Sequence, residues 1–214
     1  MSRFTILLGG DLTVTPRLKK QIAGTRIVAA DSGLRHAAAL DVVPELWVGD
    51  FDSTEPDWLD TYEDIERITF DADKDRTDGE LAVEEALSRS ASSLLLAGAF
   101  GGPRPDHAFL HLSMALALMS RSVKTLLTSG DQEGVPLPHE TSGFDYPAGT
   151  MFSILAFSEL RGLTVEGTKW PLDRVAVPFG SSLTLSNIVT GNLSVTLGEG
   201  RALLLAHLDA TSAT

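Results

Sequence analysis

Cysteine is absent from this 214-residue chain, and basic side chains are scarce beside acidic ones. Without cysteine the chain forms no disulfide, no thiolate metal site and no thiol nucleophile. With 17 basic residues against 29 acidic ones, the formal net charge is −12. A charge this negative argues against broad binding to nucleic acid and against an anionic membrane surface. We therefore expect neither nucleic acid nor a membrane as a partner.

Long hydrophobic runs are missing too. Residues 1–10 carry one arginine and a short apolar run, without the longer apolar core and cleavage site of a signal peptide. No apolar stretch approaches the roughly 20 residues that a membrane helix needs. We therefore expect a cytoplasmic protein. The length suits one domain, or one ordinary domain with a small second one.

Several standard catalytic motifs are also missing. The sequence contains no G-x-x-x-x-G-K-[ST] phosphate loop, no G-x-G-x-x-G after the first apolar run, no H-E-x-x-H and no G-x-S-x-G. The five histidines are scattered, which argues against a histidine-based metal site.

Acidic side chains, by contrast, are concentrated in one segment of the chain. Residues 50–80 hold 13 of the acidic side chains and three bases, which is a net charge of −10 within 31 residues. Such a run is usually a solvated acidic face. The alternative is a divalent-metal site, and composition alone does not choose between the two.

The first 130 residues alternate apolar runs with helical patterns. Thr77 and Glu80 have capping-box spacing and predict a helix that ends near Ser90, while Pro105 suits the first turn of another. Alternating strands and helices indicate a parallel sheet covered on both faces. The expected strands are Phe4–Leu8, Arg26–Ala30, Leu46–Val48, Ile65–Thr69, Leu94–Ala97 and Thr125–Leu127.

Beyond Gly130 the pattern changes. Residues 131–149 are rich in proline and glycine and read as a linker or long loop. The short apolar runs that follow are typical of a small antiparallel sandwich or barrel. They are Met151–Phe157, Leu163–Glu166, Arg174–Val177, Ser182–Ile188, Leu193–Leu197 and Ala202–Ala206. We thus predict an α/β fold with a three-layer parallel-sheet domain over 1–130, a linker over 131–149, and an antiparallel β domain over 150–214.

Three segments at predicted strand ends or in the loops after them carry candidate chemistry, because open α/β sheets bind ligands there. In the first, Asp50 and Asp52 follow a strand and a glycine, and such a pair suits magnesium held together with substrate phosphates. An Asx-type turn explains the same residues equally well.

The second segment runs from Asp71 to Asp78 and interleaves Lys74 and Arg76 with carboxylates. Its order does not fit an EF-hand loop, because neither possible register places glycine at position 6. Two interpretations remain equally good. The segment forms a metal–polyphosphate site, or its carboxylates simply stabilise the positive end of a helix dipole.

The third segment is the glycine-rich loop 98–104, which leads into the helix that begins near Pro105. Free amides at a helix N-terminus favour phosphate, and Arg104 adds a bidentate donor. An ordinary connecting loop is the simpler reading of this segment alone.

Together these segments resemble the thiamine pyrophosphokinase family over residues 4–208. The motifs that carry the resemblance appear in order: Ala30-Asp31-Ser32-Gly33, Gly49-Asp50-Phe51-Asp52-Ser53, Asp73-Lys74-Asp75-Arg76-Thr77-Asp78, Arg104-Pro105-Asp106-His107, Lys169-Trp170-Pro171-Leu172 and Ser186-Asn187. The chain departs from the family pattern at Ser32, Leu34 and Arg35 in the first motif, at an extra Pro103, and at His111, where the family commonly has asparagine.

The resemblance implies an ATP-binding α/β domain, a β domain that helps bind thiamine, and a homodimer with composite active sites. It implies transfer of a pyrophosphoryl group from ATP to the thiamine hydroxyl, with magnesium as cofactor and ATP as co-substrate. On this hypothesis the catalytic residues are Asp50, Asp52, Asp75, Asp78 and Arg104, and the four aspartates hold the metal. ATP is bound by Asp31, Ser32, Gly33, Ser53, Lys74, Thr77, Gly102, Asp106 and His107. Thiamine is bound by Trp170, Leu172, Ser186 and Asn187.

Some alternatives stay open at this point. The sequence does not assign the general base: Asp78 and Asp106 are candidates, and the alternative is that the alcohol needs little help. Trp170 is either a stacking platform for a thiazolium ring or a core aromatic. The activity has two rivals. One is a pyrophosphokinase of the same fold that acts on a pterin alcohol, and the other is a sensor of nucleotide or thiamine diphosphate without turnover.

Overall fold

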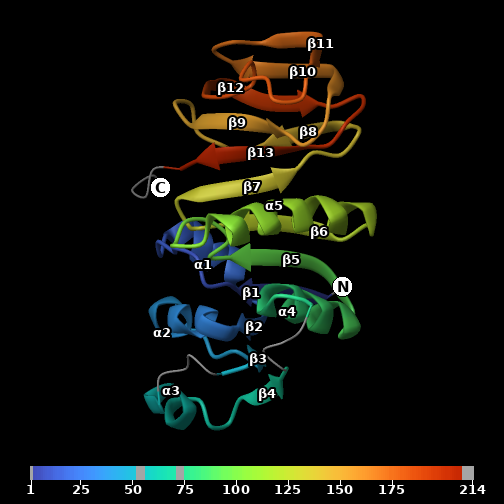
Figure 1. Cartoon of the computed structure of the whole chain (residues 1–214). Coiled ribbons are helices and arrows are strands. Elements are labelled where there is room, and N and C mark those ends of the chain that lie inside the picture. The colour runs from blue at the N-terminus through green and yellow to red at the C-terminus, as the bar shows by residue number, and fades with distance from the viewer. Residues whose placement is uncertain (1, 52–55, 71–74, 209–214) are drawn as a thin grey trace.

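A computed structural model describes residues 2–51, 56–70 and 75–208. Its described strands form one continuous 13-stranded sheet, in the order β11-β10-β12-β9-β13-β7-β6-β5-β1-β2-β3-β4, with β8 paired to β12 (Figure 1). One end of this sheet is parallel and flanked by helices, and the other is antiparallel. This confirms the predicted fold class.

The parallel half contains strands β1 (Ser2–Leu7), β2 (Arg26–Ala30), β3 (Leu46–Gly49), β4 (Glu66–Thr69), β5 (Ala91–Ala97) and β6 (Lys124–Thr128). Between them lie α1 (Pro16–Ile22), η1 (Asp31–His36), α2 (Ala37–Leu40), α3 (Pro56–Thr61), α4 (Asp78–Ser88) and α5 (Pro105–Ser120). All six predicted strands are present. Among the described helices, none is long and apolar enough to cross a bilayer.

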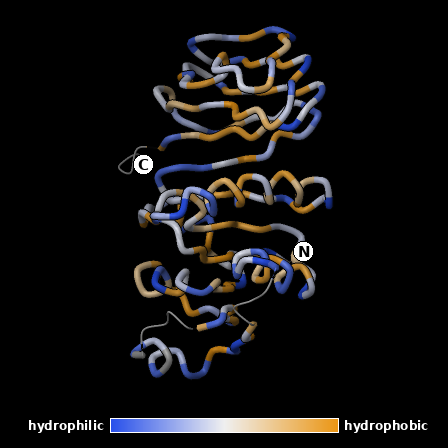
Figure 2. Tube along the Cα trace, viewed as in Figure 1, coloured by the Kyte–Doolittle hydropathy of each residue, from blue (hydrophilic) through white to orange (hydrophobic). Residues whose placement is uncertain are grey.

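Alternating side chains of the parallel strands bury two faces. On β1, Ile6 packs with α4 and α5, whereas Leu7 packs on the opposite face with α1 and α2. Figure 2 shows the hydrophobic stretches that follow the central strands. Because successive residues of a strand point to opposite faces, unbroken apolar runs are what a sheet covered on both sides requires.

The antiparallel half contains β7 (Gln132–Pro136), β8 (Thr141–Phe144), β9 (Met151–Ala156), β10 (Leu160–Thr168), β11 (Leu172–Val177), β12 (Asn187–Thr196) and β13 (Ala202–His207). β12 pairs with β9 through its first two residues and with β10 and β8 further along, so it joins two layers. Phe152, Leu163, Val195 and Leu204 are fully or almost fully buried in the core between these layers.

Two expectations for this half were wrong. The stretch 131–149 is not a plain linker, because it contains β7 and β8, and β7 pairs with β6 on one side and β13 on the other. Residues 182–188 do not form a strand up to Ser186, where the backbone turns with φ +59°. Leu183 and Leu185 alternate as strand residues would, yet both are exposed. The domain boundaries at 130 and 150 stay predictions.

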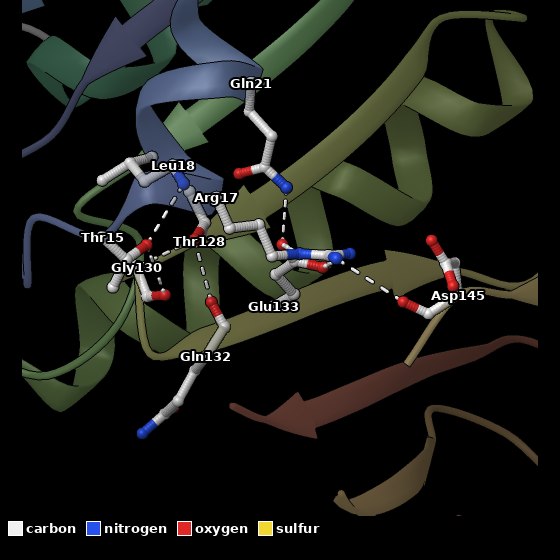
Figure 3. Close-up of polar contacts among 9 residues, drawn as sticks. All are labelled: Thr15, Arg17, Leu18, Gln21, Thr128, Gly130, Gln132, Glu133 and Asp145. Atoms are coloured by element: carbon white, nitrogen blue, oxygen red, sulfur yellow. Dashed lines mark hydrogen bonds and ion pairs between the residues drawn. The ribbon is translucent and has the colours of Figure 1, made fainter. Parts of the chain in front are cut away.

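A buried polar cluster joins the two halves (Figure 3). Glu133 on β7 is 2% exposed and receives two hydrogen bonds from the Arg17 guanidinium, at 2.6 and 3.0 Å. Gln21 Nε2 donates to the same carboxylate at 2.5 Å. Tyr146 lies beneath Arg17, and its burial together with Glu133 raises the pKa of its phenol. The cluster ties α1 to the first antiparallel strand.

Candidate active site

The loops at the carboxyl ends of the parallel strands surround a cavity of about 270 Å³. Its walls come from residues 8–10 after β1, from Ala30, Asp31, Ser32 and Arg35 at the end of β2 and in η1, and from the starts of α4 and α5. Ligands of open α/β sheets bind at this edge. The cavity is therefore our candidate active site.

At two glycine pairs the cavity wall consists of backbone without side chains. Gly9 and Gly10 follow β1, and Gly101 and Gly102 follow β5. Asp11 joins the two loops, because its Oδ2 accepts from the Gly102 amide at 2.8 Å. Gly102 has φ +77°, a conformation that favours glycine. Bare backbone of this kind lets a phosphate group approach closely.

Both α4 and α5 begin at the cavity. Thr77 caps α4 by accepting from the Glu80 amide at 3.3 Å, and Glu80 in turn accepts from the Thr77 amide at 3.0 Å, which confirms the predicted capping box. Pro105 occupies the first turn of α5. The positive ends of two helix dipoles thus lie at one cavity, an arrangement that favours a bound anion.

Two carboxylates, Asp31 and Asp78, line the same cavity. The Asp31 carbonyl accepts from the indole of fully buried Trp47 at 3.0 Å, and Asp31 has φ +43°. Gly49 packs beside it, so that Asp50 follows the end of β3 close to Asp31. Among the described residues no three histidine, aspartate or glutamate side chains group as a metal site. The described part of the site thus offers a pair of carboxylates at the cavity.

Two guanidinium groups also line the cavity, and they differ in their partners. Arg104 pairs with Asp106 at 2.6 Å, and this hydrogen-bonded partner lowers the pKa of the Asp106 carboxyl to about 2. Arg35 instead donates through Nη2 to the carbonyl oxygens of Gly9 and Gly10, at 2.5 and 2.9 Å. One arginine has a carboxylate beside it, whereas the other binds neutral carbonyls.

Two histidines complete the wall on the α5 side. His111 is 6% exposed, and its Nδ1 lies 3.0 Å from the Ala99 carbonyl. Burial lowers the pKa of His111, which favours the neutral ring, and a neutral ring that donates through Nδ1 leaves Nε2 as an acceptor. His107 lies edge-on to it, with 6.4 Å between the ring centroids.

The residues predicted for thiamine lie at the other end of the sheet, around the connection between β10 and β11. Trp170 is 52% exposed and carries the Lys169 ammonium 4.6 Å from its ring centroid. Asn187 is buried, and it holds the Trp170 backbone by donating to its carbonyl at 2.8 Å and accepting from its amide at 3.2 Å. Leu172 is half-buried against the β core, and Ser186 is exposed.

The structure brings together seven of the fourteen residues predicted for catalysis and ATP binding. Those that line the cavity are Asp31, Ser32, Thr77, Asp78, Gly102, Arg104 and His107. Gly33 packs against the Leu7 carbonyl of β1, where a side chain would not fit. Asp75 and Asp106 are exposed and are absent from the described lining, as is Asp50. Asp52, Ser53, Asp73 and Lys74 lie outside the described residues.

Sequence reasoning missed four groups that line this cavity. Gly9 and Gly10 follow the first strand, but they lack the G-x-G-x-x-G spacing of a nucleotide-binding fingerprint. Arg35 and His111 stand where the chain departs from the family pattern, so no role was assigned to them. For the glycines, the sequence offered one local signal of a phosphate-binding loop, which is a glycine pair soon after an apolar strand.

Known protein families match this chain in two adjacent blocks. Residues 20–127 match the model of the thiamin pyrophosphokinase catalytic domain, and residues 138–201 match that of the thiamin pyrophosphokinase vitamin B1 binding domain. The chain belongs to the thiamin pyrophosphokinase family. The catalytic-domain match spans the described residues that build the cavity, except for those after β1.

Individual members of the thiamin pyrophosphokinase family agree with this assignment. The thiamine pyrophosphokinase of Bacillus subtilis (strain 168) is 26% identical over 221 residues, which cover 98% of this chain and 100% of that protein. A crystal structure of thiamine pyrophosphokinase from Bacillus subtilis has a TM-score of 0.86 at 22% identity, covering 97% of this chain and 100% of the other. Thiamin pyrophosphokinase from Candida albicans has a TM-score of 0.79 at 16% identity, covering 97% and 89%. These likenesses to solved structures show the same fold.

Proposed function

We propose that this protein transfers the pyrophosphoryl group of ATP to the hydroxyl of thiamine and releases AMP. One observation carries the proposal: two helix N-termini, two glycine pairs, two carboxylates and two arginines converge on one cavity in a chain of this family. Such a cavity suits a polyphosphate with its metal ion.

In the proposed reaction the thiamine hydroxyl oxygen attacks the β-phosphorus of ATP. The bond between the β-phosphorus and the oxygen bridging to the α-phosphate breaks, AMP leaves, and the hydroxyl proton passes to an acceptor. Catalysis then depends on positioning the reactants and on offsetting charge. Arg104 and the helix N-termini stabilise phosphate charge. Asp78 is the better proton acceptor of the two candidates, because Asp106 is held by Arg104 at a pKa of about 2.

The residues present fit a magnesium ion. Mg²⁺ binds through one or two carboxylates together with substrate phosphates, and the described cavity wall provides Asp31 and Asp78. Asp50 follows Gly49, which packs against Asp31, and is a further candidate ligand, as is Asp52 from the sequence, whereas Asp75 is exposed and absent from the described lining. When bound, the ion would neutralise charge on the phosphate oxygens. We assign ATP to Ser32, Thr77, Gly102 and His107 on the same grounds.

The thiamine side of the proposal rests on Trp170. Half of its surface is exposed, and Lys169 covers one ring face, so a cationic thiazolium would stack on the opposite face. Asn187 contributes indirectly, because its amide holds the Trp170 backbone. Ser186 is exposed and has room to contact the ligand directly.

Within one chain, Trp170 is remote from the cavity. The intervening strands include β12, β9, β13, β7 and β6, and no described residue beyond 111 lines the cavity (Figure 1). The antiparallel half also exposes several large apolar side chains: Met151, Phe179, Leu183 and Leu185. We therefore propose a homodimer in which Trp170 of one subunit completes the site of the other.

Turnover with a panel of alcohols tests the function. Purified protein is mixed with ATP, magnesium and either thiamine or a pterin alcohol, and AMP and product are measured. We expect AMP in equal amount to thiamine diphosphate. AMP release with the pterin alcohol alone would contradict the proposed substrate, and nucleotide binding without AMP release would favour a sensor.

Mixing two impaired variants, assayed at a thiamine concentration below the wild-type KM, tests the composite site. Asp78→Asn damages the cavity and Trp170→Ala damages the thiamine side. If one site draws on both subunits, random re-pairing in a symmetric dimer restores about a quarter of the wild-type sites. A mixture no more active than its components, from subunits that native mass spectrometry shows to have exchanged, would contradict the composite site.

A further inference from the structure

Arg35 holds the loop that follows β1 from a position on the cavity wall. Its Nη2 donates to the carbonyls of Gly9 and Gly10, across 26 and 25 residues of chain. The neighbouring His36 ring also contacts the Gly10 carbonyl, at 3.0 Å. These contacts fix where the guanidinium lies relative to the glycine pair.

The remaining donors of Arg35 have no acceptor in the described part of the chain. A guanidinium has five N–H groups, and the hydrogen bonds to the Gly9 and Gly10 carbonyls occupy only Nη2. Nε and Nη1 bond to no described residue, and the side chain is exposed where it lines the cavity. Because its acceptors are neutral carbonyls, Arg35 keeps a full positive charge, whereas Asp106 offsets that of Arg104.

We propose that Arg35 binds the polyphosphate of the nucleotide directly, with its Nε and Nη1 donors, and so supplies the cavity with a guanidinium that forms no ion pair with a described carboxylate. The inference rests on the proposed function only in taking the ligand to be a nucleoside triphosphate. A fixed guanidinium matches phosphate geometry, and a chain of formal charge −12 needs local cations to bind so anionic a ligand.

A purely structural role makes a different prediction. If Arg35 only fastens the Gly9–Gly10 loop, a neutral donor of similar length should serve nearly as well. Its removal should then weaken binding of adenosine and ATP to a similar extent. Direct contact with phosphate instead predicts a loss that grows with the charge of the ligand.

Calorimetric titration of adenosine, AMP and ATP, each with magnesium, separates these roles. The variants are Arg35→Ala, Arg35→Gln and Arg35→Lys, with Arg201→Ala as control, because it removes the same charge from an exposed side chain of the antiparallel half. We expect Arg35→Ala to raise the Kd for ATP by about tenfold or more, as loss of a charge-assisted hydrogen bond does, and to leave adenosine nearly unchanged. Arg35→Lys should retain part of the preference for ATP over adenosine, and Arg35→Gln should not.

Equal losses for adenosine and ATP, or full recovery of ATP affinity in Arg35→Gln, would overturn the inference. So would unchanged ATP affinity in a folded Arg35→Ala protein. Wild-type protein that binds ATP more tightly than adenosine but does not turn over thiamine would refute the proposed function and leave the role of Arg35 standing. A wild-type protein that binds no ATP would overturn both.

Discussion

The two halves of the sheet present their candidate ligand surfaces in opposite ways. The parallel half gathers charged and glycine residues into a cavity of about 270 Å³ between its loops, whereas the antiparallel half carries Trp170 on an exposed surface. Parallel strands align all their carboxyl ends, so several loops meet at one edge. Antiparallel strands alternate in direction and lack such an edge. The difference teaches that one chain shapes the first surface into a cavity, whereas it leaves the second exposed.

The largest expected effect comes from the cavity. Asp78→Asn removes a carboxylate from its wall, and we expect kcat to fall about a hundredfold or more, as when an electrostatic contact to the transition state is lost. Asp75→Asn, three residues earlier and exposed, should change kcat much less. Circular dichroism would confirm that both variants fold. Equal losses in the two would show that the cavity wall does not define the metal site.

Glu133→Ala tests the junction of the halves. It leaves Arg17 and Gln21 without their shared partner, and we expect the free energy of unfolding to fall by about 2 kcal/mol, the scale of a lost charge-assisted hydrogen bond. Glu159→Ala, which breaks the exposed pair with Arg161, should cost at most about 1 kcal/mol. Urea unfolding measures both. A Glu133→Ala protein as stable as the Glu159 variant would mean that the cluster does not stabilise the junction.

Trp170→Ala tests the proposed thiamine contact of the antiparallel half. Loss of a stacking ring should raise the KM for thiamine about tenfold, in line with a cation–π contact shielded from water, and should leave the KM for ATP nearly unchanged. Steady-state kinetics with each substrate varied in turn provides the measurement. A matched rise in both KM values would argue that Trp170 acts through the fold instead of the ligand.

The smallest effect concerns His111. Burial lowers the pKa of its ring in the folded chain, whereas in the unfolded chain the ring titrates near 6.5. Below pH 6.5 the unfolded state therefore takes up a proton that the folded state does not, so the free energy of unfolding decreases as the pH falls. For one proton the slope is at most about 1.4 kcal/mol per pH unit.

The variant His111→Asn removes this titration while keeping a donor for the Ala99 carbonyl. We expect its stability to depend less on pH than that of the wild type between pH 7.5 and 5.5, as followed by Tm. Identical pH profiles for the two proteins would show that His111 titrates alike in both states.

Local sequence signals predicted the parallel half well. Its strands are short apolar runs bounded by turn residues, and the Thr77 capping box marks the start of α4. Prediction failed where tertiary pairing overrode local signals. β7 contains Gly134 and Pro136 yet lies between β6 and β13, with Pro136 at its end. The residues of the site were predictable where they follow strand ends, whereas Arg35 depends on a contact between separate loops.

The place of β7 in the sheet has a consequence for any attempt to divide this protein. A cut after residue 130 would expose β6 on one fragment and both β7 and the charged Glu133 on the other. Each fragment would then present a bare edge strand, the kind of surface that pairs with other chains and aggregates. The two blocks recognised by separate family models therefore share one continuous sheet, and the protein is better studied as a whole than as isolated modules.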